Sequence, residues 1–109
     1  MDRDTNVLSE FSIIVAITNN NDRCYFNELK PIRLTSLSKG ATPFVNSTEA
    51  RKALEENFMY LSGILEYYNI SSIIIQNLSI VSDEDSNDTK LLTEEEIFLW
   101  YYFHIPPKN

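Results

Sequence analysis

Residues 83–105 read DEDSNDTKLLTEEEIFLWYYFHI, an acidic block followed at once by a run that is apolar or aromatic at nearly every position. Thr93 and Glu96 have the spacing of a capping box, and the dipole of a helix favours glutamates in its first turn. Pro106 and Pro107 would end that helix. The stretch therefore predicts a C-terminal helix. Because it would be apolar all round, it must be buried in the core or covered by a partner.

Short apolar runs upstream predict strands. Runs that are rich in β-branched residues or that alternate between apolar and polar residues lie at 11–18, 23–29 and 32–37. The sequence NNND at 19–22 favours a turn, which would join the first two strands as a hairpin. Residues 70–81, ISSIIIQNLSIV, predict one long strand or two short ones.

A stripe of apolar residues at helical spacing predicts one long helix over 48–68. Asn46 or Ser47 can cap it, and Glu49 stands three residues after Asn46 as a capping-box partner. The stripe consists of Ala50, Leu54, Phe58, Leu61, Leu65 and Tyr68. The order β-β-β-α-β-α predicts an α+β domain, in which a small antiparallel or mixed sheet packs on this helix and the C-terminal aromatic helix completes the fold.

The length of the chain suits a single domain. With 109 residues and an apolar fraction of 43%, it has enough material for one core. We expect a flexible N-terminus over 1–10 and a single domain over 11–109. No basic segment followed by an apolar one opens the sequence, and no run reaches the roughly 18 apolar residues that cross a bilayer. A cytoplasmic protein without membrane association is therefore expected.

The net charge of −7 is unevenly distributed. Residues 70–109 hold −5 of it, whereas residues 1–40 are neutral. Such a chain repels phosphate backbones, which argues against direct nucleic-acid binding. It is attracted instead to basic surfaces, so a protein partner is expected.

The acidic block also approximates the calcium-loop pattern D-x-[DN]-x-[DN]-G-x5-E. The matching oxygen donors are Asp83, Asp85, Asn87 and Glu94. A hard cation takes such donors at alternate positions together with a distal carboxylate. However, Asp88 holds the glycine position, and Lys90 stands where these loops carry an apolar residue. A metal-binding loop is therefore the alternative reading of a segment that also suits a solvated loop, and no other cofactor is expected.

Catalytic constellations are not apparent. His104 is the single histidine, and catalysis would need a nucleophile or carboxylate beside it in space. Cys24, the single cysteine, falls in a predicted strand, where cysteine usually packs as a small apolar residue. The sequence predicts a protein that is not an enzyme.

One stretch of about 30 residues, from Cys24 to Leu54, combines a hairpin, an Arg-Leu-Thr strand, an Ala-x-x-Phe step and a helix opening with Ser/Thr-x-Glu-Ala. The residues concerned are Tyr25, Phe26, Arg33, Leu34, Thr35, Ala41, Phe44, Ser47, Glu49 and Ala50. This series resembles a ββ(β)α module of small phage and Gram-positive proteins. Most proteins with the module have no assigned activity, so the resemblance implies a phage or mobile-element origin and no particular function.

These observations predict a non-enzymatic inhibitor or regulator of an anti-defence or immunity type. Its acidic surface would occupy the basic groove of a host nucleic-acid-binding protein, where carboxylates compete with phosphates for Arg and Lys. The residues expected to bind are Asp83, Glu84, Asp85, Asp88, Glu94, Glu95, Glu96, Trp100 and Tyr101. The two aromatic residues would be apolar anchors. The sequence leaves open whether the aromatic segment is core, meets another protein or pairs with a second copy.

Overall fold

A computed structural model describes residues 6–29, 32–82 and 87–97 of the chain. The strands are β1 (Asn6–Thr18), β2 (Arg23–Leu29), β3 (Ile32–Thr35), β4 (Ile70–Ser82) and β5 (Asn87–Ile97). The 3-10 turn η1 (Ser38–Gly40) and the helices α1 (Ser47–Glu56) and α2 (Phe58–Tyr67) lie between β3 and β4 in the chain.

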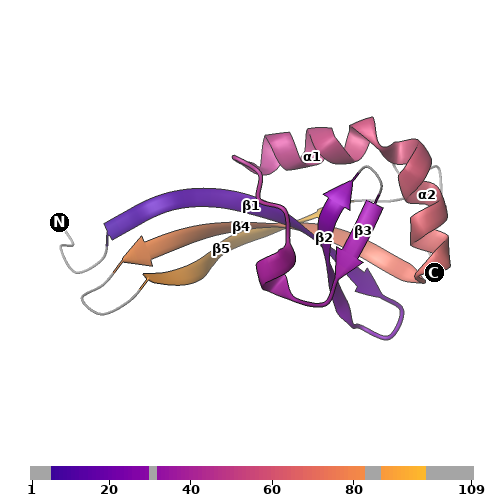
Figure 1. Cartoon of the computed structure of the whole chain (residues 1–109), viewed down its shortest axis with the longest axis horizontal. Coiled ribbons are helices and arrows are strands. Elements are labelled where there is room, and N and C mark those ends of the chain that lie inside the picture. The colour runs from indigo at the N-terminus through magenta and orange to yellow at the C-terminus, as the bar shows by residue number, and fades with distance from the viewer. Residues whose placement is uncertain (1–5, 30–31, 83–86, 98–109) are drawn as a thin grey trace.

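The strands form one antiparallel sheet in the order β3-β2-β1-β4-β5. β1 and β4 have 13 residues each and pair from Asn6↔Ser82 to Thr18↔Ile70. β1 thus begins five residues before the strand expected at 11–18. Together with β5 these two strands make a long curved arm (Figure 1), and the molecule measures 48 × 26 × 23 Å.

The α+β architecture predicted from the sequence, with the order β-β-β-α-β-α, is wrong. The described chain is mostly a five-stranded antiparallel sheet, and residues 87–97 form β5 where a helix was expected to begin. Pairing with β4 explains the difference, because β5 supplies backbone partners from Ser82↔Asn87 to Ile73↔Ile97, whereas a helix must first form a costly isolated turn. Residues 98–109, the aromatic part of the expected helix, lie outside the described residues.

The single long helix expected over 48–68 is also wrong, because Asn57 divides it into α1 and α2. The Asn57 amide Nδ2 donates to the Ala53 carbonyl at 2.7 Å, and its backbone N–H donates to the Leu54 carbonyl at 3.1 Å. Such local hydrogen bonds let an asparagine compete with the regular helix. The predicted cap is confirmed, since Asn46 Oδ1 accepts from the Glu49 N–H at 2.9 Å. Neither described helix is long and apolar enough to cross a membrane.

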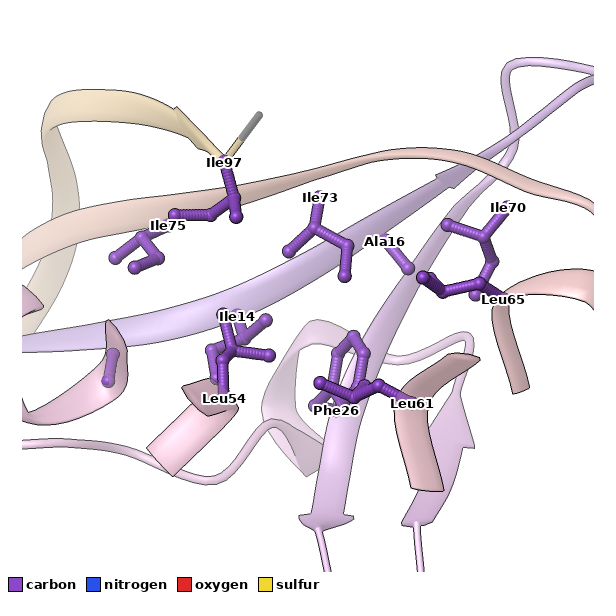
Figure 2. Packing of buried hydrophobic residues seen from close by; sticks show 11 residues of the cluster. Ile14, Ala16, Phe26, Leu54, Leu61, Leu65, Ile70, Ile73, Ile75 and Ile97 are labelled. Carbon is purple, nitrogen blue, oxygen red and sulfur yellow. The ribbon is translucent and has the colours of Figure 1, made fainter. Parts of the chain in front are cut away.

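The main core lies between the two helices and one face of the sheet, which we call the helix face. Figure 2 shows Leu54, Leu61 and Leu65 of the helices meeting side chains of β1, β2 and β4. The strand residues in this cluster are Ile14, Ala16, Phe26, Ile70, Ile73, Ile75 and Ile97. Burying each large aliphatic side chain contributes roughly 1.5–3 kcal/mol, so this cluster is the chief source of stability.

The opposite side of the sheet, which we call the open face, carries a second apolar cluster. Its buried members are Ile13, Val15 and Ile74, which are flanked by half-buried Phe11, Ile17, Tyr25 and Leu78. Ala41, from the connection after β3, also packs there. No side chain of α1 or α2 that the structure describes belongs to this cluster, so these side chains cover only the helix face of the sheet.

Candidate functional site

Strand alternation separates the three consecutive glutamates of β5. Glu94 and Glu96 lie opposite Gln76 and Ile74 on the open face, whereas Glu95 lies opposite Ile75 on the helix face. The acidic triplet therefore does not form one surface, as it would in the first turn of a helix.

Glu95 belongs to a polar network that joins the sheet to α1. Its carboxylate lies 3.2 Å from the Arg51 guanidinium and accepts from Asn77 Nδ2 at 2.8 Å. Asn77 also donates to Thr93 Oγ1 at 2.9 Å and accepts from the hydroxyl of Ser12, which is only 1% exposed. The network gives a buried hydroxyl on β1 its acceptor and holds α1 against the outer strands.

The same network stabilises the charged form of Glu95. The hydrogen bond from Asn77 is the largest cause that lowers the pKa of Glu95 below its ordinary 4.5, and a side-chain hydrogen bond with Ser47 and the Arg51 guanidinium act in the same direction. Burial opposes them by raising the pKa. Because the folded-state pKa is lower than the unfolded one, Glu95 stabilises the fold above about pH 4.5 and ceases to do so as the pH falls through its folded pKa.

Glu95→Gln should therefore destabilise the protein in a pH-dependent manner. We expect a loss of up to about 1 kcal/mol at neutral pH, since the carboxylate is partly solvated. In calorimetric melting curves, the difference in stability between wild type and variant should shrink as the pH falls below about 4.5 and vanish once Glu95 is protonated in the folded state. Glu96→Gln, on the other face of the same strand, is the matched control. A difference that stayed constant down to the pH at which the protein unfolds in acid would contradict an ionised Glu95 in the network.

On the open face, the carboxylate of Glu94 meets groups from two other strands. Gln76 Nε2 donates to it at 2.7 Å, and the Arg23 guanidinium of β2 lies 3.5 Å away. Both members of this ion pair are exposed, so the pair adds little to folding. Glu96 is exposed and forms no ion pair with any residue that the structure describes.

Apolar residues adjoin these carboxylates on β5. Phe11, Leu78 and Leu91 are register partners and make a cross-strand row on the open face, which ends at β5. A register shift at Leu92 sets both Leu91 and Leu92 against Leu78, as in a β-bulge. Leu91 and Leu92 are 52% and 49% exposed. We call Leu91, Leu92, Glu94 and Glu96 the β5 surface.

The other predicted binding residues are more scattered. Asp88 lies in β5 opposite Val81, exposed, near the far end of the arm. Asp83, Glu84, Asp85, Trp100 and Tyr101 lie outside the described residues. Sequence reasoning missed the leucines of β5 and the network around Asn77. A polar pair, Gln76 and Asn77, inside the apolar run of β4 was the available signal for the network.

The calcium reading gains no support from the described part of the chain. Asn87 and Glu94 lie seven residues apart on β5, so about 23 Å of extended strand separates their positions. Within the described residues, which do not include Asp83 and Asp85, no group of three or more His, Cys, Asp or Glu residues could hold a metal ion. Cys24 is half-buried and packs against the main core.

Comparisons of the chain with protein-family models, with curated proteins and with solved structures found no significant match.

Proposed function

We propose that this chain is a non-enzymatic protein-binding inhibitor or regulator that presents the β5 surface to a basic partner protein. The observation that supports this best is the adjacency of two exposed leucines and two exposed glutamates on a face that the described helices leave uncovered. Buried apolar anchors supply most of the binding energy in protein interfaces, and surrounding charges supply specificity and speed of encounter.

The chemistry of the surface suggests the class of partner. A net charge of −7 steers the chain toward positive potential, and carboxylates compete with phosphates for Arg and Lys. A nucleic-acid-binding protein of the host, acting in the cytoplasm, is the partner class that fits. The resemblance at 24–54 to phage and Gram-positive modules agrees with an inhibitor carried by a phage or mobile element.

Removing the two open-face carboxylates should slow binding without unfolding the protein. We expect Glu94→Gln/Glu96→Gln to lower the association rate with the native partner by about three- to tenfold at low salt and to flatten its salt dependence. The partner would be isolated from extracts of the source cells on immobilised wild-type protein, identified by mass spectrometry and measured by surface plasmon resonance.

Glu55→Gln/Glu56→Gln is the matched control, because it removes the same charge from exposed positions on α1. The proposal predicts that this control binds nearly as fast as wild type. It fails if both double variants lose the same amount, which would indicate a general charge effect, or if the β5 variant binds at the wild-type rate.

A further inference from the structure

We propose that the outer edge of β5 binds an extended basic segment of the partner, which adds to the sheet as a sixth, antiparallel strand. This inference rests on the proposed function and names the form of its ligand. β5 is the last strand in the sheet order and has 11 residues (Figure 1), and no described residue pairs with its outer side. An edge strand presents alternate N–H and C=O groups that an added strand can bond, which is an established mode of peptide recognition.

The side-chain rows of the open face specify what the added strand should carry. Three rows cross the sheet and end at β5: Phe11–Leu78–Leu91, Ile13–Gln76–Glu94 and Val15–Ile74–Glu96. A strand about 4.8 Å beyond β5 would continue each row by one residue, because directly opposed residues share a face. The first row calls for an apolar residue, and the other two call for Lys or Arg.

The direction of the added strand fixes the order of these residues. All four pairings in the sheet are antiparallel, and antiparallel pairing is slightly the more stable per residue. An antiparallel partner runs from Glu96 toward Leu91. Since the bulge makes Leu91 and Leu92 count as one position, the sequence of the partner reads basic, any, basic, any, apolar.

Charge favours such a segment over a second copy of the chain. β5 itself carries Asp88, Glu94, Glu95 and Glu96 against the single base Lys90. Two such strands side by side would oppose like charges, which destabilises strand pairing. A basic strand avoids this repulsion and forms two ion pairs, one with the carboxylate of Glu94 and one with that of Glu96.

Arg23 acts as an internal competitor in this arrangement. Its guanidinium already lies 3.5 Å from the carboxylate that the incoming base would meet. Arg23→Ala should therefore expose Glu94 and tighten binding of a basic strand. Arg33→Ala is the matched control, because Arg33 pairs with Glu28 in the β2–β3 hairpin and its loss changes the net charge equally.

The test uses a fluorescent synthetic peptide with the sequence Lys-Thr-Lys-Thr-Ile between flanking threonines, and measures binding to the whole protein by anisotropy. We expect scrambling the order at constant composition, or Glu94→Gln/Glu96→Gln, to weaken binding about tenfold, equivalent to about 1.4 kcal/mol. Arg23→Ala should strengthen it at least about twofold, whereas Arg33→Ala should not.

Backbone alkylation separates strand addition from simple charge attraction. Two further peptides are N-methylated at neighbouring central positions, and since alternate amides of a strand face its partner, only one of the two should lose binding. Strand addition is overturned if the two methylated peptides bind equally well or lose binding equally. It is also overturned if scrambling the peptide sequence does not change the affinity. If this happens while the native partner still depends on Glu94 and Glu96, the proposed function stands without it. A stable homodimer through β5 in solution also overturns it.

Discussion

Replacing Leu61 by Ala is expected to lower the free energy of unfolding by about 2–5 kcal/mol. Leu61 is 1% exposed on α2 and belongs to the cluster that joins both helices to the sheet (Figure 2). Truncation removes three side-chain carbons from water-free surroundings and leaves a cavity that the packed strands cannot fully close. Urea denaturation followed by circular dichroism measures the change.

Leu37→Ala provides the control for this prediction, because it is the same substitution at a leucine that is 67% exposed in the connection after β3. It should change the free energy of unfolding by no more than about 0.5 kcal/mol. Equal effects of the two substitutions would mean that α2 does not pack on the sheet through Leu61, and the arrangement of the core would then be wrong.

Replacing Asn77 by Ala is expected to cost about 1–3 kcal/mol, which is more than the loss of an exposed polar residue costs. The amide is the acceptor for the buried Ser12 hydroxyl and the donor for Glu95 and Thr93. Without it, the hydroxyl is left buried with no acceptor and Glu95 loses the largest cause of its lowered pKa.

A second substitution tests the physical reason for this cost. Ser12→Ala removes the stranded hydroxyl, so Ser12→Ala/Asn77→Ala should be more stable than the sum of the two single effects predicts. Thermal or urea unfolding of the four proteins gives the coupling between Ser12 and Asn77. Strict additivity would show that these side chains do not depend on each other.

Local sequence patterns predicted the secondary structure correctly where the residues of a segment alone determine it. The runs at 11–18, 23–29 and 70–81 fall within β1, β2 and β4, because β-branched and alternating residues suit a pleated surface. The cap at Asn46 was likewise readable, since it needs only residues three apart. The division of the helix over 48–68 could not be predicted in this way. The apolar stripe continues across Asn57, so its spacing gives no sign that the helix breaks there.

The candidate site was harder to predict because it depends on contacts between distant segments. The sequence TEEE in β5 satisfies the rules for a helix start, and only the free side of β4 makes a strand the better alternative. In a strand, side chains repeat every 2 residues instead of every 3.6 as in a helix. Glu95 therefore lies on the opposite face of the sheet from Glu94 and Glu96. Glu95 then contacts Arg51 and Asn77 and has a structural role. Because both contacts come from distant segments of the chain, no local sequence rule could indicate them.

The pairing of β1 with β4 has a consequence for how the chain acquires its structure over time. Register partners such as Asn6 and Ser82 lie far apart in sequence, so β1 and β4 can pair only after the chain through β4 has been synthesised. Before that moment, the described segments that can pair with β1 are the short β2 and the bridge between Ser12 and Phe44. The β4–β5 hairpin, by contrast, joins neighbouring segments, and hairpins in general form within roughly 1–10 μs. We expect the docking of β1 onto this hairpin to be slow, because long-range pairing must close a large loop before it stabilises the chain.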